Sequence, residues 1–432
     1  MNVLLINPPN CGRSIPEEKY GITSLKQIFR GEPLALEELA GNLTDHTVRI
    51  VDLKANPDEL ESAISEFKPD IVGITGVTCE ANTVVKLAVH IKAQSTAIIV
   101  VGGIHASIDP EFFNKTVIDY IIVGIGKKKF AELIRAIERG ATPMGSIRGV
   151  LSPQAGKKLL GHIQPDTIAD LEESAPPAYG KVRQYRSHYI LEKLRLNMGF
   201  VASAFGCPYK CSFCCIYGQA GGKYLTKSVD AVVRDIQLLH DIPVIRLVDA
   251  NTFDDIDRAY TLCRTLMQKG IKKQYLADIR SDTVVRHPEM LKEWKKTGLR
   301  AVIIGFEEVD NVRLRAMNKA NQVTVNTEAI SILNELGITI VGDFVISPDY
   351  DEDDFERLEG YLETTDIDLP MITVLTPLPG TPLYAQLKHR ITNTNLDYYT
   401  LTNAVIDTKL KEERFYTLYA RLIERSHIEA RI

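Results

Sequence analysis

The run Gly206-Cys-Pro-Tyr-Lys-Cys-Ser-Phe-Cys214 contains three cysteines, Cys207, Cys211 and Cys214, in the spacing C-x-x-x-C-x-x-C. The aromatic residue Phe213 precedes the last of them. Thiolates are the usual ligands of iron–sulfur clusters, and one tight loop can direct three thiolates at one cluster. Three ligands on a four-iron cluster leave one iron open to bind and reduce a small molecule. The pattern therefore favours a reaction centre over a structural site.

Two alternatives to a cluster remain open from the spacing alone. A structural zinc ion usually has four ligands, and Cys215, which directly follows Cys214, is poorly placed to be the fourth. The second alternative is that the three thiols are buried side chains with no common ligand. The spacing ranks the cluster first, the zinc site second and unrelated thiols last.

The composition is that of a globular protein of two to three domains. The chain has 432 residues, of which 45% are hydrophobic and 25% charged. Its formal net charge of −5 offers no basic field to nucleic acid. The apolar run at 3–6 lacks the charged and small-residue flanks of a signal peptide, so we expect none, and no apolar run approaches the length of a membrane span. There are seven cysteines, an odd count, and three of them cluster in one loop; without an export signal we expect a reducing cytoplasm rather than a disulfide framework.

Residues 1–140 alternate apolar strands with amphipathic helices, such as those predicted at 57–67 and 82–93. Continuous Val and Ile runs separated by helices indicate a parallel sheet covered on both faces. Five such units predict a flavodoxin-like, Rossmann-like domain, whose ligand lies outside the carboxyl ends of the strands. The predicted strands are 2–8, 47–53, 71–77, 97–103 and 120–126.

Residues 141–195 break this rhythm, and the proline pair at 176–177 predicts a linker. From 196 to 385 the alternation resumes, and six βα units indicate a partial (β/α)6 barrel with its chemistry at the carboxyl ends of the strands. The cysteine loop follows the first of these strands and so lies at that end. The polar and aromatic tail, 386–432, is predicted to cap the barrel. The predicted barrel strands are 197–204, 244–249, 274–278, 301–306, 339–346 and 372–375.

The barrel resembles the radical S-adenosylmethionine (SAM) superfamily. The mark of that superfamily is C-x-x-x-C-x-aromatic-C after the first strand of a partial (β/α)6 barrel, which here is Cys207, Cys211, Phe213 and Cys214. The resemblance implies a [4Fe–4S] cluster whose open iron is chelated by SAM. One electron then cleaves SAM to a 5′-deoxyadenosyl radical, which abstracts a substrate hydrogen. The part of the protein is to position the reactants and exclude water.

The first domain narrows the resemblance to the cobalamin-binding branch of that superfamily. An opening strand that runs into Asn-Pro-Pro, here Asn7-Pro8-Pro9, is typical of the branch. Gly102-Gly103-Ile104-His105 matches its Gly-Gly-x-His loop. The resemblance covers about residues 1–385. Three barrel runs stand where related enzymes carry similar sequences: 280–282, 305–307 and 376–382.

Glycines at two neighbouring strand ends are candidate cobalamin contacts. Missing side chains at Gly102 and Gly103, and at Gly124 and Gly126, let a corrin or a nucleotide tail approach the backbone. A single glycine more often makes only a tight turn, but four at neighbouring strand ends favour a ligand. Side chains on nearby loops complete the predicted cobalamin contacts: Asn7, Thr78, Cys79, Glu80 and His105.

Two of these side chains have ordinary alternatives. For His105, a hydrogen bond within a loop is an equal possibility. A lone small thiol such as Cys79 usually fills a core.

The first domain departs from the family pattern at two places. Many cobalamin domains use D-x-H-x-x-G, whose histidine replaces the base of the cofactor beneath cobalt, but none of the nine histidines here has an aspartate two positions before it. We therefore expect no histidine ligand from that motif. Family members often read Gly-Glu-Gly-Glu after the fifth strand, where this chain has Gly124-Ile-Gly-Lys127. The loss of two carboxylates and the gain of Lys127, Lys128 and Lys129 are expected to alter contacts to the nucleotide tail.

The barrel offers four candidate SAM contacts besides Phe213. The Gly-Gly-Glu motif of many radical SAM enzymes is absent after the second strand, where Asp249 or Asn251 is the candidate acceptor for the SAM ammonium. Arg280 ends the third strand and is expected to pair with the SAM carboxylate. Glu307 ends the fourth strand and is expected to bind the ribose hydroxyls or the ammonium. A structural Arg280–Glu307 pair is the alternative.

The resemblance implies a cobalamin-dependent radical SAM methyltransferase, which methylates an unactivated carbon via a 5′-deoxyadenosyl radical and methylcobalamin. The alternative is a cobalamin-binding radical SAM cyclase or ring-rearranging enzyme without methyl transfer, and a non-enzymatic cobalamin or metal sensor is a third class. The implied partner is an electron donor such as flavodoxin or ferredoxin. The sequence assigns no catalytic residue and leaves the substrate open among small molecules, lipids, tetrapyrroles and peptides.

Overall fold

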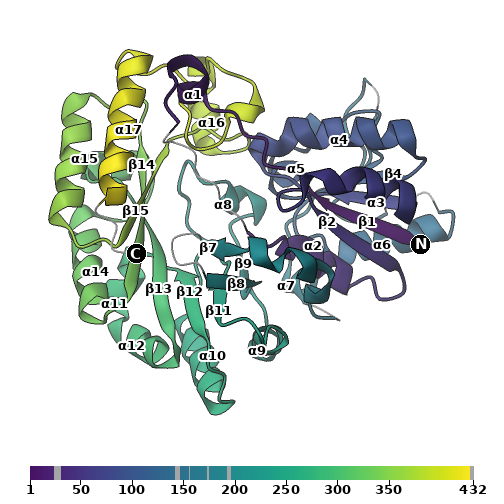
Figure 1. The fold of residues 1–432 in the computed structure, drawn as a ribbon, viewed down its shortest axis with the longest axis horizontal. Coiled ribbons are helices and arrows are strands. Elements are labelled where there is room, and N and C mark those ends of the chain that lie inside the picture. Colours follow the sequence, from purple (N-terminus) through teal and green to yellow (C-terminus); the bar gives the residue numbers. More distant parts are fainter. Residues whose placement is uncertain (24–30, 142–145, 155, 173–174, 192–195, 429–432) are drawn as a thin grey trace.

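The computed structural model of the protein describes residues 1–23, 31–141, 146–154, 156–172, 175–191 and 196–428. Over these residues the chain folds into two α/β units that lie side by side (Figure 1). The predicted fold class is confirmed, because a doubly wound domain comes first and an open barrel of parallel strands follows.

The first domain is built on a six-stranded sheet in the order β2-β1-β3-β4-β5-β6. Its first five strands pair in parallel, in the order expected of a flavodoxin-like domain. The sixth strand, β6 (Val150–Leu151), pairs antiparallel with β5 and lies inside the segment predicted as a linker. The parallel strands are β1 (Asn2–Asn7), β2 (Thr47–Asp52), β3 (Ile71–Ile74), β4 (Ile98–Val101) and β5 (Tyr120–Ile122).

Helices cover both faces of this sheet. Val3 and Leu5 of β1 are buried in the cluster that contains side chains of α2 and α6, whereas Leu4 and Ile6 are buried with α3 and α4 on the opposite face. Successive side chains of a strand point to opposite faces, so a strand covered on both faces reads as one apolar run. These helices are α2 (Leu34–Gly41), α3 (Leu60–Phe67), α4 (Ala81–Gln94) and α6 (Lys127–Glu138).

The segment between the domains is held to both of them. It contains the 3-10 helix η4 (Tyr179–His188). The Tyr179 hydroxyl donates to the backbone oxygen of Phe200 in the barrel, at 3.1 Å, and the Tyr189 hydroxyl donates to Asp52 of the first domain, at 2.9 Å. This linker therefore ties the two domains together through buried polar contacts.

The barrel is a curved sheet in the order β15-β14-β13-β12-β11-β8-β7. Six of its strands are parallel, and the short edge strand β7 (Ile190–Leu191) runs antiparallel to β8. The parallel strands are β8 (Leu196–Val201), β11 (Val244–Leu247), β12 (Gln274–Asp278), β13 (Leu299–Glu307), β14 (Thr339–Ile346) and β15 (Leu369–Val374). The helices around them are α9 (Val229–Leu238), α10 (Ile256–Gln268), α11 (Ser281–Arg286), α12 (Pro288–Thr297), α13 (Asn311–Ala316), α14 (Val323–Glu335), α15 (Glu352–Thr364) and α16 (Pro382–Leu387).

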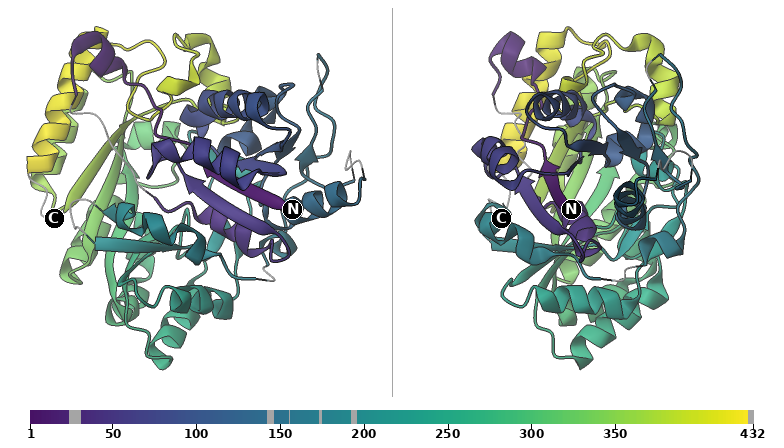
Figure 2. Two further views of the ribbon diagram at one scale, coloured as in Figure 1. Left: turned by 45° about the vertical axis from the view of Figure 1, so that its right-hand side comes forward. Right: turned by 90° about the vertical axis from the view of Figure 1, so that its right-hand side faces the viewer.

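The C-terminal segment reaches from the barrel back to the first domain. Its helix α17 (Glu412–Ile428) packs on β15, where the Tyr419 hydroxyl donates to the backbone oxygen of Ile372 at 2.7 Å. The start of α17 lies beside α1 (Ile15–Tyr20), as both views in Figure 2 show, and Glu412 accepts hydrogen bonds from Lys19 and Tyr20. The tail thus joins the N-terminal segment to the barrel.

We expect Tyr189→Phe to destabilise the protein by about 1–3 kcal/mol, because it leaves one oxygen of the fully buried Asp52 carboxylate without its donor. Denaturant unfolding measures the loss. Tyr398→Phe is the control, since it removes a similar bond from the Tyr398 hydroxyl to the exposed Glu18 and should cost at most about 0.5 kcal/mol. Equal losses in the two variants would contradict the role given to the linker contact.

Candidate functional site

The cysteine loop lies between β9 (Ala204–Gly206) and α8 (Cys215–Gln219), at the carboxyl end of β8. Gly206, at the start of the loop, has a φ of 87°. A Cβ atom there would lie 2.2 Å from the backbone oxygen of Lys223, near the neighbouring strand β10 (Tyr224–Thr226). The position therefore requires glycine for both its conformation and its packing.

The loop is held to the barrel through the backbone of Ser212. Its amide donates to the backbone oxygen of Met317 at 2.9 Å, and its carbonyl accepts from the amide of Leu383 at 2.9 Å. The Asn318 side chain adds a 2.7 Å bond to the backbone oxygen of Lys210. Segments far apart in the sequence thus fix the backbone on which the three cysteines are mounted.

The three cysteines are free thiols, with Cys211 buried and Cys207 and Cys214 half-buried. Burial, together with the neighbouring thiols Cys215, Cys211 and Cys207, raises the pKa of Cys214 to about 12. Burial also raises the pKa of Cys207, an effect that the nearby Arg280 opposes. Thiolates at these positions would need a cationic group, such as a metal, to offset the cost of their ionisation.

The structure bears on the choice between a cluster and a zinc ion. Among the residues that the structure describes, no three His, Cys, Asp or Glu side chains are spaced to share one metal ion. A four-iron cluster does not require such spacing, because each thiolate binds a different iron. The donor set of Cys207, Cys211 and Cys214 therefore fits a cluster.

The two candidate SAM contacts after β11 have different surroundings. Both Asp249 oxygens accept hydrogen bonds within the protein, from the Ser203 and Ala204 amides and the Ser203 hydroxyl, each at 2.7 Å. Asn251 is 1% exposed, and its amide nitrogen donates to Asp254 at 2.8 Å. Its carbonyl oxygen accepts no hydrogen bond from any described residue. Asn251 thus keeps a free acceptor, whereas Asp249 is used to bind the backbone of Ser203 and Ala204, just before the cysteine loop.

Arg280 and Glu307 do not pair with each other. The Arg280 guanidinium stacks on Tyr209 of the cysteine loop, 3.6 Å from the ring centre, and donates to Asp282 at 2.9 Å. Glu307 accepts from the Lys319 ammonium at 2.6 Å, and both of these side chains are buried. The alternative of an Arg280–Glu307 pair is therefore not seen.

Glu307 is aimed by an irregularity in β13. The register between β13 and β14 shifts between Gly305 and Glu307, which marks a β-bulge. Glu307 has a φ of 66°, an uncommon value for a residue with a side chain. A Cβ atom on Gly305 would lie 2.2 Å from the Glu307 carboxylate, so glycine makes room for it.

Phe213, the remaining candidate SAM contact, is half-buried in the cysteine loop. All five residues stay predictions as SAM contacts.

Charged side chains on the barrel strands form a cluster that the sequence motifs did not predict. Arg246 of β11 pairs with Asp278 of β12 at 2.5 Å. Asp343 lies on β14, opposite Gly305 of β13. Burial, together with the carboxylates of Glu307 and Asp278, raises the pKa of Asp343 to about 8, although Lys319 and Arg246 oppose the shift. The sequence did carry a signal for this cluster, because Asp343 is a charged residue in the middle of an otherwise apolar strand.

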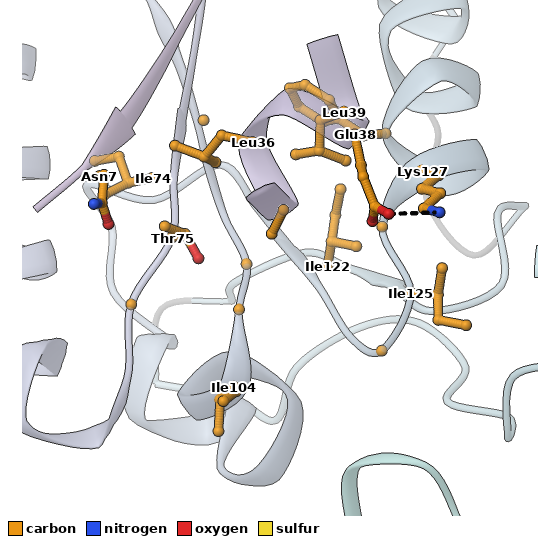
Figure 3. Close-up of a pocket in the computed structure, with 18 of the residues that line it drawn as sticks. Asn7, Leu36, Glu38, Leu39, Ile74, Thr75, Ile104, Ile122, Ile125 and Lys127 are labelled. Atoms are coloured by element: carbon orange, nitrogen blue, oxygen red, sulfur yellow. Dashed lines mark ion pairs between the residues drawn. The ribbon is translucent and has the colours of Figure 1, made fainter. Parts of the chain in front are cut away.

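A cavity of about 370 Å³ lies at the carboxyl ends of the first sheet (Figure 3). Most of the labelled side chains are apolar, including Leu36, Leu39, Ile74, Ile122 and Ile125. The barrel closes it with residues after β8 and at the end of α8: Ala202, Ala204, Phe205 and Gln219. A largely apolar cavity between the two domains fits a flat ring system with an organic tail.

Six of the nine predicted cobalamin contacts line this cavity, and three do not. Those that line it are Asn7, Glu80, Gly102, Gly103, Gly124 and Gly126. Thr78 is buried at the start of the 3-10 helix η2 (Thr78–Glu80), and Cys79 accepts at its backbone oxygen from the Cys11 thiol at 3.7 Å. His105 is fully buried against Phe112 and Phe113, and neither ring nitrogen has a partner among the described residues. Burial lowers the pKa of His105 to about 4. The contacts themselves stay predictions.

The glycines at the strand ends differ in purpose. A Cβ atom on Gly103 would lie 2.6 Å from the Thr75 hydroxyl, and one on Gly124 would lie 2.1 Å from the Asp166 carboxylate. Both residues have positive φ, so they serve tight turns and close packing. A Cβ atom on Gly102 would meet only one atom within 4 Å, at 3.8 Å. Gly102 is therefore the position that leaves open space in the cavity.

Lys127, which departs from the family pattern, lies in the wall of this cavity. It pairs with Glu38 at 3.1 Å, as Figure 3 shows, and Glu38 also pairs with Lys227 of the barrel at 2.7 Å. Burial disfavours the Glu38 carboxylate, but the ammonium groups of Lys227 and Lys127 outweigh this and lower its pKa to about 2. Lys129 pairs with Asp166 at 2.6 Å. These lysines thus find anionic partners in the protein.

The described part of the chain contains no helix with the length and apolar character needed to cross a bilayer.

Comparisons with known proteins agree with this division of the chain. The B12 binding domain family matches residues 26–134, and the Radical SAM superfamily matches residues 201–362. The hopanoid C-3 methylase of Methylococcus capsulatus is 27% identical over 90% of this chain and 75% of its own length. An uncharacterized methyltransferase of Pyrococcus horikoshii, PH0819, is 28% identical over 95% of this chain and 88% of its own length.

A solved structure shares the whole arrangement. It is that of the radical S-adenosylmethionine methyltransferase TsrM from Kitasatospora setae, with cobalamin and a [4Fe–4S] cluster bound. It superposes with a TM-score of 0.68 and 19% identity, covering 91% of this chain and 78% of that chain. At this identity the likeness shows a common fold.

We expect Gly102→Leu to weaken binding of cobalamin by roughly tenfold or more, because the new side chain would occupy the open part of the cavity. Visible absorption of cobalamin retained by the protein after equilibrium titration measures the change. Gly360→Leu is the control, since Gly360 also has open space around it but lies on α15. Unchanged binding in Gly102→Leu, with a melting temperature like that of the parent, would exclude this cavity as the cobalamin site.

The raised pKa of Asp343 predicts a pH-dependent stability. A carboxyl whose pKa rises from 3.8 to about 8 on folding binds protons more readily in the folded state, so stability falls as pH rises through that range. We expect Asp343→Asn to flatten this dependence and to raise the melting temperature relative to the parent at pH above about 8 but not at pH near 4. Parallel melting curves at all pH values would contradict the raised pKa of this carboxyl.

Proposed function

We propose that this chain, in which a B12-binding domain precedes a radical SAM domain, is a cobalamin-dependent radical SAM methyltransferase that acts on an unactivated carbon. One observation carries the proposal. Helix α8 begins at Cys215, beside the last cysteine of the loop, and its last residue, Gln219, lines the cavity of the first domain. A single short helix therefore connects the cluster ligands to the wall of the cobalamin cavity.

The two cofactor sites have complementary chemistry. When bound, the cluster supplies the electron that cleaves SAM, and cobalamin supplies the methyl group. Two relatives that align with nearly the whole chain carry the names methylase and methyltransferase, which favours methyl transfer over ring closure. The residues of this chain bind, orient and shield those groups.

Several side chains have defined parts in this proposal. Cys207, Cys211 and Cys214 would bind three irons of the cluster. Asn251, with its free and buried carbonyl oxygen, would accept from the SAM ammonium. Asp249 would act indirectly, because its hydrogen bonds to the Ser203 and Ala204 backbone hold the strand that leads into the cysteine loop.

The reductant and the compartment follow from the same chemistry. A cluster that cleaves SAM needs a low-potential electron, and a flavodoxin or ferredoxin would supply it. A reducing cytoplasm, already indicated by the cysteine content, would keep the half-buried Cys207 and Cys214 reduced until the cluster is loaded.

Product analysis with labelled SAM tests the proposal. The protein would be loaded anaerobically with iron, sulfide and cobalamin, then supplied with SAM deuterated at the methyl group, a strong reductant and extract of the source organism. We expect both 5′-deoxyadenosine and S-adenosylhomocysteine, and a product that carries the deuterated methyl group. Formation of 5′-deoxyadenosine without S-adenosylhomocysteine would favour a cyclase, and formation of neither would favour a binding protein.

Cysteine variants provide the matched control. Alanine at Cys207, Cys211 or Cys214 should abolish 5′-deoxyadenosine formation, because each removes one of three cluster ligands. Cys215→Ala should retain it, since this adjacent thiol is not needed as a ligand. Equal loss in Cys215→Ala would point to four thiolates on one metal and against the open iron.

A further inference from the structure

We propose that Arg280 and Tyr209 form a fixed cation–aromatic pair that positions the cysteine loop and favours the reduced state of its cluster. This inference rests on the cluster of the proposed function but not on methyl transfer. It assigns Arg280 a role that precedes, and does not require, contact with SAM.

The pair lies inside the cysteine loop. Tyr209 stands between Cys207 and Cys211, and the centre of its ring is 3.6 Å from the Arg280 guanidinium carbon. The Arg280 side chain is buried, with 8% of its surface exposed. A guanidinium stacked this closely in a buried site is attracted to the ring face and loses little to solvent screening.

The guanidinium is held independently of any ligand. Its Nε donates to Asp282 at 2.9 Å, and its Nη2 donates to the backbone oxygens of Lys319 and Ala320 at 3.2 and 3.3 Å. The plane of the group is therefore fixed by the barrel. Tyr209 rests on that plane, so its half of the loop is located by Arg280.

The same barrel segment also holds the other half of the loop. Met317 accepts from the amide of Ser212, and Asn318 donates to the backbone oxygen of Lys210. Asn318 and Ala320 have positive φ values of 52° and 49°, which produce the tight turn that brings these groups together. Residues 317–320 thus connect the backbone contacts of the loop with the side-chain contact through Arg280.

The charges around the pair predict an effect on the cluster. A buried cation such as the Arg280 guanidinium, placed beside a cluster, stabilises the added electron. Two carboxylates face Arg280. Asp282 also pairs with Arg286 at 2.7 Å. Burial raises the pKa of Asp254, and the charge of Arg280 opposes this shift. Removal of Arg280 would leave these carboxylates less compensated near the cluster, which makes reduction harder.

Four substitutions separate the effect of the charge on the cluster from the effect of the ring contact on the position of the loop. Arg280→Met removes charge and stacking, whereas Arg280→Lys keeps the charge but loses the planar contact. Tyr209→Leu removes the ring face, whereas Tyr209→Phe keeps it. Arg264→Met is the control, because Arg264 stacks on Tyr260 at 5.3 Å on the exposed part of α10, away from the loop.

The readouts are made without SAM on the full-length, anaerobically loaded protein. They are the iron bound per chain at limiting iron and the midpoint potential from a redox titration followed by electron paramagnetic resonance. We expect iron bound to fall roughly threefold in Arg280→Met and Tyr209→Leu, and to stay at the parent value in Tyr209→Phe and Arg264→Met. The potential should become more negative in Arg280→Met and stay near that of the parent in Arg280→Lys.

A double variant completes the test. If the two side chains act as one pair, Arg280→Met with Tyr209→Leu should bind no less iron than Arg280→Met alone. An Arg280→Met protein with parent iron content and potential, but weakened SAM binding, would overturn the inference and leave Arg280 as a SAM contact only. Should Arg280→Met fail to fold, Arg280→Lys and Tyr209→Leu carry the comparison. A parent protein that binds no cluster would overturn the proposed function itself.

Discussion

The backbone of Ser212 joins three parts of the chain that are far apart in sequence. Its amide bonds to Met317, after α13, and its carbonyl bonds to the amide of Leu383, at the start of α16. These two hydrogen bonds fix the backbone of the loop that carries Cys207, Cys211 and Cys214. The remaining features of the site are arranged around this rigid loop: the stacking of Arg280, the free oxygen of Asn251 and the cavity beyond Gln219.

The second constraint is the meeting of two parallel sheets at their carboxyl ends. All strands of a parallel βα unit end at the same edge, so each domain has one edge suited to a ligand. Here the cavity of the first domain is closed by residues that follow β8 of the barrel. Tyr179, Tyr189 and the Glu38–Lys227 pair hold the domains in this arrangement by buried polar contacts. The cavity is therefore lined by both domains.

The sequence predicted most of the fold because its signals are local. Strand β12 was predicted with the bounds that the structure shows, since its apolar residues lie between helical stretches. The short strand β6 was missed inside the predicted linker, because two residues carry no periodic signal.

The site was less predictable because it depends on pairings across the fold. Motif spacing placed the three cysteines in one loop, but nothing local indicates that Arg280 would stack on Tyr209 or that Lys319 would pair with Glu307. Likewise, Gly103 and Gly124 look like ligand glycines in the sequence, yet they make room for Thr75 and Asp166. Such roles follow from tertiary packing, which a single sequence does not display.

In the proposed function, the cluster loop and the cavity that would hold cobalamin form one reaction site. Electron paramagnetic resonance of protein loaded with both cofactors tests it most directly, because cobalamin in its cobalt(II) state and the reduced cluster are both paramagnetic. If α8 alone separates the two sites, the cobalt signal should be broadened and relax faster when the cluster is reduced. Two unperturbed signals that add without interaction would contradict a shared site.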